Sequence, residues 1–283
     1  MIKFAVIGHP LTQSLSAVMH NAMLKELGIE GSYELLDTES EDLVARVKML
    51  KSQGYNGFNV TIPHKVPITL FLDEFDKSAD IAGCANTVKI MPDKSLYGYN
   101  TDIYGFKTAI PKNIQENSDN GKVSILGTGG AARAAAIAFC ETGVKTIDFY
   151  ARNVINASSM VNFLREKFPQ VKINLKQMQS LNNLSDSLML VNSTPIGMRG
   201  KAMGTSPVEE EILKTLPENA AVYDIVYNPL KTEFLKIAQK NGYETITGLD
   251  MFVHQGAKAF EIWTGKKANP DVMKMAALEE LAE

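Results

Sequence analysis

Residues 123–134 read VSILGTGGAARA, and this stretch decides the fold. An aliphatic, β-branched run passes directly into glycines and then into alanines. Gly127 suits the tight turn that ends a strand, Gly129 lets a pyrophosphate approach the backbone, and Ala132 permits close packing of helix on strand. The N-terminus of the helix that follows offers unpaired N–H groups to phosphates. The stretch therefore predicts a dinucleotide-binding turn and a cofactor-dependent enzyme.

The sequence beyond this turn has the periodicity of alternating strands and helices. Residues 131–142 read as a helix and 145–150 as the next strand, which completes a βαβ unit. Further strands are expected at 188–192, 221–226 and 244–246, with helices at 158–168 and 232–241. Such alternation predicts a nucleotide-binding domain, which we place at residues 104–248.

The N-terminal part alternates in the same way, and its pattern predicts a parallel sheet covered by helices. Strands are expected at 3–7, 32–36, 57–62, 87–90 and 95–99, and helices at 16–27, 41–52 and 66–72. A last helix at 250–263 is apolar over more than one face, so it should be buried. We expect it to return to the first domain, which then comprises residues 1–103 completed by 249–283.

Length and composition fit a two-domain α/β protein that binds small molecules. The 283 residues are 45% apolar and 22% charged, with a net charge of −3, which gives no basic footprint for nucleic acid. No apolar stretch approaches the ~18 residues of a membrane span, and the N-terminal apolar run is too short for a signal peptide. We expect a cytoplasmic protein, monomer or homodimer, with no nucleic-acid or membrane partner.

Cysteine and histidine give no support for a metal site or a disulfide. Cys84 and Cys140 lie far apart among small residues, and the 4 histidines are scattered. Buried, reduced thiols and no metal are therefore expected.

Polar clusters fall at the ends of strands or helices of the first domain. They are SLS at 14–16, NVTIPHK at 59–65, GCANT at 83–87 and GYNTD at 98–102. Parallel strands present their carboxyl ends at one edge of a sheet, where ligands usually bind. The coincidence of four clusters predicts one binding site.

Each cluster also has a purely structural interpretation. Ser16 and Asp102 suit the N-caps of the helices that follow them. Asn59 alternates with apolar residues as on the polar face of a strand, Asn86 suits a turn, and Lys65 alone suits a solvated surface position. Taken together, the clusters favour function over these separate explanations.

The same clusters make the chain resemble the shikimate dehydrogenase family over nearly its full length. Further matching motifs are HN at 20–21, NSTPIGM at 192–198, DIVYNP at 224–229, GLDMFVHQ at 248–255 and WTG at 263–265. Members of that family reduce 3-dehydroshikimate to shikimate with NADPH, on the route to chorismate and the aromatic amino acids. The resemblance implies an α/β substrate domain, a Rossmann-type NADP-binding domain, and C-terminal helices that return to the first domain.

The resemblance also implies roles for individual residues. Lys65 and Asp102 would be catalytic. The substrate would be bound by Ser14, Ser16, Asn59, Thr61, Lys65, Asn86, Asp102, Tyr227 and Gln255. The cofactor would be bound by Gly127, Thr128, Gly129, Gly130, Ala131, Ala151, Arg152, Asn153, Thr194, Met198, Val226, Gly248 and Met251.

These residue types suit the chemistry that the resemblance implies. Hydride arriving at a carbonyl carbon builds negative charge on its oxygen, which the Lys65 cation would stabilise and can protonate. The Asp102 carboxylate can accept from two vicinal hydroxyls. Arg152 can pair with a 2′-phosphate, whereas Asp148, at about the distance where an NAD enzyme places its acid, falls inside a strand. We therefore expect NADP rather than NAD.

Three alternatives stay open, of which the most distant, a different two-domain Rossmann enzyme, would leave SLS at 14–16 and Gln255 unexplained. A quinate/shikimate dehydrogenase of mixed cofactor preference would need the same carboxylate and hydroxyl contacts. A non-catalytic nucleotide-binding regulator could keep the fold, although it would have no need for Lys65 and Asp102 together. The sequence leaves undecided how strictly NADP is preferred and how the proton moves between Lys65 and Asp102.

Overall fold

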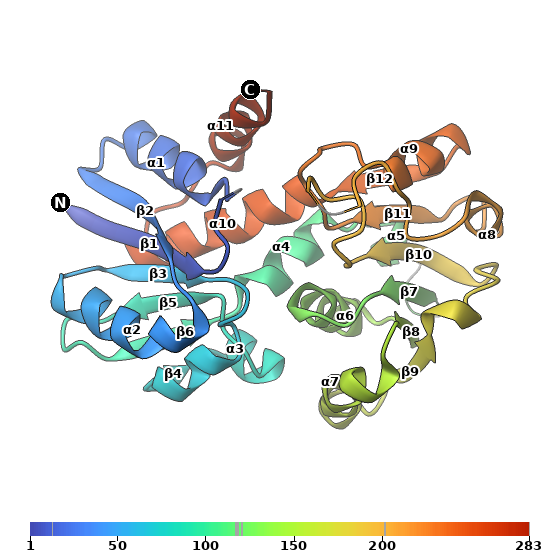
Figure 1. The fold of residues 1–283 in the computed structure, drawn as a ribbon, viewed down its shortest axis with the longest axis horizontal. Coiled ribbons are helices and arrows are strands. Elements are labelled where there is room, and N and C mark those ends of the chain that lie inside the picture. The colour runs from blue at the N-terminus through green and yellow to red at the C-terminus, as the bar shows by residue number, and fades with distance from the viewer. Residues whose placement is uncertain (13, 117–118, 120, 201, 283) are drawn as a thin grey trace. The chain divides into compact units, whose positions relative to one another are not determined.

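The computed structural model describes residues 1–12, 14–116, 119, 121–200 and 202–282. The chain forms two compact units, one made of Met1–Gly105 with Val253–Glu283 and the other of Phe106–Phe252 (Figure 1). Two helices run across the boundary in the sequence, α4 (Thr101–Ala109) and α10 (Gly248–Thr264). The first unit is therefore discontinuous in the chain.

The first unit is built on a sheet with strand order β2-β1-β3-β5-β6-β4. Its strands are β1 (Ile2–Gly8), β2 (Gly31–Asp37), β3 (Gly57–Val60), β4 (Glu74–Phe75), β5 (Thr87–Ile90) and β6 (Leu96–Tyr99). Its further helices are α1 (Ser16–Glu26), α2 (Leu43–Ser52), α3 (Lys77–Ala82) and α11 (Pro270–Ala282), with short 3-10 segments η1 (Ser40–Asp42) and η2 (Pro67–Phe71).

This sheet is mixed, and the expectation of a wholly parallel one was wrong. Strand β1 pairs in parallel with β2 and β3, but β5 is antiparallel to both β3 and β6. The connection between β5 and β6 explains part of the difference. Only residues 91–95 join them, whereas a parallel pair needs a crossover of about a dozen residues or more.

The two faces of this sheet are covered by different helices. Successive residues of a strand point to opposite faces, so Ala5 packs with the α2 side while Phe4 points to the other face. There Phe4 stacks on Trp263 of α10 with ring centroids 4.7 Å apart, and the Trp263 indole N–H donates to the Val88 carbonyl at 2.9 Å. The C-terminal helices thus return to the first unit, as expected.

The second unit contains a wholly parallel sheet with strand order β12-β11-β10-β7-β8-β9. Its strands are β7 (Lys122–Leu126), β8 (Thr146–Ala151), β9 (Lys172–Gln177), β10 (Ser187–Asn192), β11 (Ala221–Asp224) and β12 (Glu244–Thr247). Its helical segments are α5 (Lys112–Glu116), α6 (Gly130–Thr142), α7 (Val154–Lys167), η4 (Met178–Ser180), α8 (Glu210–Leu213) and α9 (Glu233–Lys240). The strand order reverses between β7 and β10, which is the topological switch point where doubly wound sheets bind ligands.

Two residues predicted to be N-caps lie within their helices instead. Ser16 is the first residue of α1 instead of its N-cap, and the Ser14 hydroxyl oxygen accepts the Ser16 N–H at 3.4 Å. Asp102 lies inside the first turn of α4, where Asn100 accepts the Ile103 N–H at 3.4 Å. Because neither residue is spent on capping, both hydroxyl and carboxylate groups are available for other contacts.

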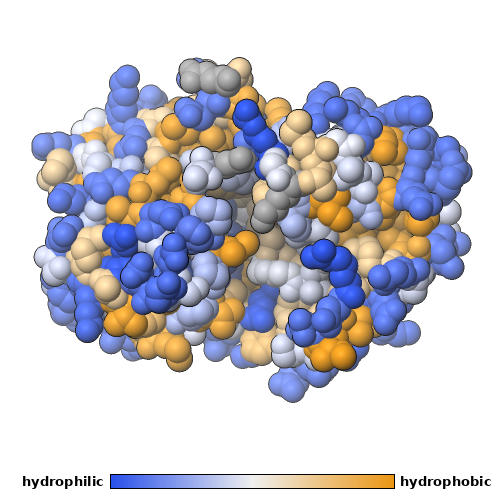
Figure 2. Space-filling view, viewed as in Figure 1, coloured by the Kyte–Doolittle hydropathy of each residue, from blue (hydrophilic) through white to orange (hydrophobic). Residues whose placement is uncertain are grey.

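The face of the molecule seen in Figure 2 carries both polar and apolar residues. Figure 2 shows hydrophilic residues interspersed with apolar ones over the face in view. Among the described residues, no helix is both long and apolar enough to cross a membrane.

We expect Gly57→Ala to destabilise the first unit, because the added Cβ would lie 2.4 Å from the Trp263 ring and 2.7 Å from the Val88 carbonyl oxygen. Overpacking of this kind costs about 1–3 kcal/mol. Urea unfolding measures the loss. Gly129→Ala is the matched control, because nothing lies within 4 Å of its added Cβ. Equal stability of Gly57→Ala and the wild-type protein would contradict the close approach of β3 and α10.

Candidate functional site

A buried ion pair forms the centre of the first unit's polar site. The Lys65 ammonium lies 2.6 Å from Asp102 Oδ2, with side chains 19% and 8% exposed. Lys65 follows β3, and Asp102 follows β6 at the start of α4. A charge this buried is costly unless it is paired, so each residue makes the other tolerable at this place.

Asn86 holds the second oxygen of the Asp102 carboxylate. Its side-chain amide donates to Asp102 Oδ1 at 2.9 Å and is also within reach of Thr101 Oγ1 at 3.0 Å and Gln255 Oε1 at 3.3 Å. The Asn86 side-chain oxygen accepts the Thr101 backbone N–H at 2.7 Å. One amide therefore fixes the start of α4 and connects it with Gln255 of α10.

Asn59 contacts Asn86, and both N–H groups of its side-chain amide are already engaged. Its amide nitrogen donates to the Asn86 carbonyl at 3.1 Å and to Thr87 Oγ1 at 3.0 Å, while its oxygen accepts from the Tyr33 hydroxyl at 2.7 Å. An amide has two N–H groups and two oxygen lone pairs. Asn59 can thus only accept from a ligand, through its remaining lone pair.

Tyr33 was missed by the sequence analysis. It is buried in β2, and the tyrosine ring stacks on His20 with centroids 4.3 Å apart. Burial raises the pKa of Tyr33, a change that a hydrogen bond with Ser16 opposes. The hydroxyl therefore connects Ser16 with Asn59. In the sequence Tyr33 lies in a predicted strand but outside the polar clusters, and its partners come from distant segments.

His20 is a neutral aromatic residue in this core. Its ring is fully buried, and neither ring nitrogen has a hydrogen-bond partner among the described residues. Burial lowers the pKa of His20 to about 3. The imidazole therefore packs as an uncharged ring at neutral pH.

The remaining substrate residues predicted from the resemblance lie in different places. The Ser14 hydroxyl donates to the Ser16 hydroxyl at 3.3 Å, before α1. Thr61 follows β3 and is half-buried, with its methyl group against Gly8 of β1. Tyr227 belongs to the second unit, where it stacks on Phe252 at 4.5 Å and burial raises its pKa to about 12.

The glycine turn of the second unit leaves open space at the N-terminus of α6. Gly127 adopts φ +98° directly after β7, and a Cβ there would lie 2.8 Å from the Ser193 hydroxyl oxygen. Gly129 caps α6, and a Cβ on it would meet nothing within 4 Å. The space beside Gly129 and the N–H groups at the start of the 13-residue helix fit the phosphates of a dinucleotide.

Arg152 and Asn153 follow β8 at the same edge of the sheet. Arg152 is exposed, and no carboxylate of the described residues forms an ion pair with it. Asn153 is the N-cap of α7, and its side-chain oxygen accepts the Asn156 N–H at 3.1 Å. The guanidinium therefore remains available to a phosphate, whereas the Asn153 oxygen has one of its two lone pairs engaged in the cap.

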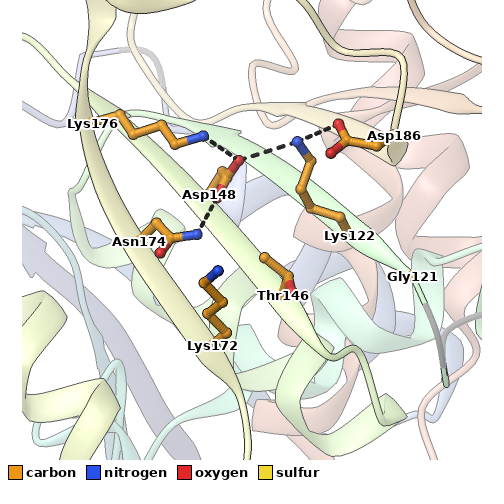
Figure 3. Close-up of a pocket in the computed structure, with 8 residues that line it drawn as sticks. All are labelled: Gly121, Lys122, Thr146, Asp148, Lys172, Asn174, Lys176 and Asp186. Carbon is orange, nitrogen blue, oxygen red and sulfur yellow. Dashed lines mark hydrogen bonds and ion pairs between the residues drawn. The ribbon is translucent and has the colours of Figure 1, made fainter.

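Asp148 is engaged elsewhere (Figure 3). Its carboxylate, 2% exposed, lies 2.7 Å from Lys176 and 3.2 Å from Lys122, and Asn174 donates to it at 2.7 Å. Burial would raise the pKa of Asp148, but these hydrogen bonds outweigh it and lower the pKa. These side chains line a pocket that also includes the first residues of β7, β8 and β9. The pocket therefore lies toward the amino ends of the strands, away from Gly127. Asp148 is therefore in no position to take a ribose hydroxyl at the glycine turn.

The other predicted cofactor residues follow the carboxyl ends of the strands beyond the switch point. Thr194 and Met198 lie in the loop after β10, Val226 follows β11, and Gly248 and Met251 begin α10. A Cβ on Gly248 would lie 2.0 Å from the Ile225 carbonyl oxygen, so only glycine allows this approach. Thr128, Gly130 and Ala131 complete the turn and Ala151 ends β8.

Both cysteines are buried thiols outside any disulfide, as expected for Cys84 and Cys140. Within the described part of the chain, no group of three His, Cys, Asp or Glu side chains could hold a metal ion.

Comparison with known proteins gives consistent matches. Residues 6–88 match the shikimate dehydrogenase substrate binding domain, and residues 248–278 match the shikimate 5′-dehydrogenase C-terminal domain. The chain is 37% identical to a shikimate dehydrogenase (NADP(+)) of Caldanaerobacter subterraneus subsp. tengcongensis, over 95% of this chain and 93% of the relative.

Two solved structures are similar over almost the whole length. A shikimate dehydrogenase in complex with NADP+ is 36% identical with a TM-score of 0.89, covering 100% of this chain and 96% of the other. A shikimate 5-dehydrogenase from Thermus thermophilus, in complex with NADP(H) and shikimate, is 35% identical with a TM-score of 0.84, covering 99% of each chain.

We expect Gly129→Ala to weaken dinucleotide binding without a large loss of stability. The new methyl group meets no protein atom within 4 Å, so it occupies the space that the pyrophosphate would use. Alanine at an N-cap costs less than about 1 kcal/mol relative to glycine. Fluorescence titration with NADPH measures affinity, and thermal unfolding measures stability. Unchanged NADPH affinity would mean that the phosphates bind elsewhere.

Proposed function

The chain belongs to the shikimate dehydrogenase family, and we propose that Lys65 and Asp102 are its catalytic pair. The protein is an NADP-dependent oxidoreductase acting on a CH–OH group, the 3-hydroxyl of shikimate, with 3-dehydroshikimate as the product of oxidation. The observation that carries the residue assignment is the buried ion pair at 2.6 Å. A lysine on the solvated surface would be stabilised by water and would not require the Asp102 carboxylate.

The proposed substrate contacts follow from the donors and acceptors that remain unused. Lys65 has three N–H groups, one of which is held by Asp102, so two can point to a substrate oxygen. Each oxygen of Asp102 has one protein donor and retains a lone pair for a ring hydroxyl. Ser14 and Ser16 would bind the substrate carboxylate, while Asn59, Thr61, Asn86 and Gln255 would line the ring, with Tyr227 near the carboxylate.

Lys65 would act on the oxygen at which the reaction takes place. NADPH supplies hydride to the carbonyl carbon when it is bound. The Lys65 ammonium then stabilises the negative charge on the oxygen and donates a proton to it, and Asp102 keeps the ammonium oriented. In the oxidative direction Lys65 takes the proton back.

The second unit would hold NADP through the residues named for it. Gly127 to Ala131 cradle the pyrophosphate at the N-terminus of α6, and Arg152 pairs with the 2′-phosphate. Ala151, Asn153, Thr194, Met198, Val226, Gly248 and Met251 would complete the pocket. Because Asp148 is occupied by lysines, that carboxylate is not free to favour NAD.

The proposal also covers the partners, the assembly state and the cellular compartment of the protein. We expect small-molecule partners only, and a monomer or homodimer in the cytoplasm, where the two free cysteines would stay reduced. Sedimentation equilibrium distinguishes the two assembly states.

The experiment that tests the function is a steady-state assay of shikimate and quinate oxidation, each with NADP and with NAD. The proposal expects shikimate with NADP to give the highest kcat/KM. Faster quinate oxidation would identify a quinate dehydrogenase instead. Tight NADP binding with no oxidation of either substrate would favour a nucleotide-binding regulator.

We expect Lys65→Ala to lower kcat and kcat/KM by similar factors, about 10²- to 10⁴-fold, because general acid–base assistance has that size. The KM for shikimate should change little, since the other contacts remain. Steady-state kinetics, with thermal unfolding to verify the fold, provide the measurement.

Lys65→Arg is the control for the proton. Arginine keeps the charge, but its pKa of about 12 or more prevents ready proton exchange. Retention of most activity by Lys65→Arg would exclude proton transfer by Lys65. A raised KM with intact kcat in Lys65→Ala would make this residue a binding group only.

We expect Arg152→Ala to weaken NADP binding about ten- to a hundredfold while NAD binding changes little. A charge-assisted contact of this kind contributes roughly 1.5–3 kcal/mol. Lys145→Ala is the matched control. Lys145 is an exposed cation that directly precedes the first residue of β8, whereas Arg152 directly follows the last. Equal losses for NADP and NAD would contradict the assignment of Arg152 to the 2′-phosphate.

A further inference from the structure

We propose that Asp224 and Asn192 form a buried clamp that positions the two loops holding the nicotinamide half of NADP(H). Neither side chain is assigned to the cofactor itself, so both would be positioning residues, on the premise of the proposed NADP-dependent function. The glycine turn after β7 and Arg152 after β8 would take the phosphates. The rest of the cofactor would then extend past the switch point to the loops after β10 and β11.

The clamp joins the carboxyl ends of two neighbouring strands. Asn192 is the last residue of β10, Asp224 is the last residue of β11, and the two face each other in the parallel register. Both are 0% exposed, and the Asn192 amide donates to Asp224 Oδ1 at 2.9 Å. The contact therefore sets the positions at which both loops leave the sheet.

Asn192 organises the loop after β10. Its side-chain oxygen accepts from the Thr194 N–H at 3.0 Å and from the Thr194 hydroxyl at 2.7 Å. Its amide nitrogen also donates to the Ile196 carbonyl at 3.2 Å. Three contacts from one side chain define the path of residues 193–196, which include the proposed cofactor residue Thr194.

Asp224 does the same for the loop after β11. Its Oδ1 accepts from the Val226 N–H at 3.0 Å, and its Oδ2 accepts from the Thr232 hydroxyl at 2.6 Å. Thr232 is the N-cap of α9, so one carboxylate holds both ends of the segment between β11 and α9. That segment contains Val226 and Tyr227, proposed for cofactor and substrate.

The clamp is also sensitive to protonation, because no cation of the described residues pairs with Asp224. The groups that face it are neutral: Asn192 on β10, Thr247 at the paired position of β12, and Thr232 at the start of α9. Of the acidic residues on the neighbouring helices, Glu233 of α9 pairs with Lys236, and Asp250 of α10 raises the pKa of Tyr223, the residue before Asp224, beside the larger effect of burial. Burial raises the pKa of Asp224 to about 6, against the effect of its three hydrogen bonds.

Protonation would weaken the clamp. A protonated carboxyl becomes a donor through one oxygen, so it can no longer accept from all three partners as arranged. NADPH affinity should therefore decrease as the pH falls through about 6. The 2′-phosphate itself titrates near pH 6, so the comparison must be made between variants.

The test measures NADPH affinity by fluorescence titration from about pH 5.5 to about pH 8, a range that spans the titration of Asp224, without substrate. Asp224→Ala and Asn192→Ala remove the clamp and should each weaken NADPH about tenfold or more at the upper end of this range. Asp224→Asn carries a donor in place of one carboxylate oxygen, as the protonated carboxyl does, so it imitates the protonated clamp at every pH. It should bind NADPH more weakly than the wild-type protein at the upper end of the range and lose less affinity as the pH falls.

Ser187→Ala is the matched control. Ser187 begins β10 and shares a buried hydrogen bond of 2.7 Å with Ser124, at the opposite end of the strand from Asn192. This variant should lose stability in thermal unfolding without any change in NADPH affinity. It therefore separates the position of the loops from the general stability of the sheet.

Two results would overturn the proposal. If Asp224→Ala and Asn192→Ala lose stability as Ser187→Ala does but bind NADPH normally, the pair is merely structural. If Asp224→Asn loses the same affinity at low pH as the wild-type protein, Asp224 is not the titrating group. Failure of the proposed function is distinguishable, because the wild-type protein itself would then not oxidise shikimate with NADP, whatever the variants do to NADPH affinity.

Discussion

The polar site of the first unit depends on the ion pair between Lys65 and Asp102. Two opposite charges at 2.6 Å, both largely removed from water, are stable only as long as each keeps its partner. The pair therefore joins the segment that follows β3 to the start of α4. Asn86 completes it by holding the second carboxylate oxygen, and the same amide connects the pair with Gln255. The surrounding hydrogen bonds follow from the need to satisfy this buried charge.

Hydrogen-bond capacity separates ligand-binding groups from supporting ones within this network. Asn59 uses both of its N–H groups on Asn86 and Thr87, so its contribution is chiefly to hold the floor of the site. Lys65 retains two N–H groups, and it is also the member of the network that carries a positive charge. The resemblance named both Asn59 and Lys65 as substrate ligands, and the count of occupied donors shows how differently each could bind one.

The features that could be predicted from the sequence are those that depend on residues close together in the chain. The turn at Gly127 and Gly129, the alternation of strands and helices, and the polar clusters at strand ends are local patterns of this kind. Pairing across the sheet is different, because it depends on register and on segments far apart in the chain. The hydrogen bond of Tyr33 to Asn59 and the antiparallel pairing of β5 with β3 therefore became visible only in the fold. The short connection at 91–95 was a local sign that β5 and β6 are antiparallel.

Three buried carboxylates, those of Asp102, Asp148 and Asp224, show the same dependence on neighbours that the sequence does not reveal. Asp102 is compensated by one lysine and an amide, and Asp148 by two lysines and an amide. Within the described chain Asp224 meets only neutral donors, so burial raises its pKa to about 6, whereas hydrogen bonds from cations lower that of Asp148. Burial of similar degree thus leads to opposite shifts, and its neutral surroundings make Asp224 the carboxylate with a reason to change charge near neutral pH.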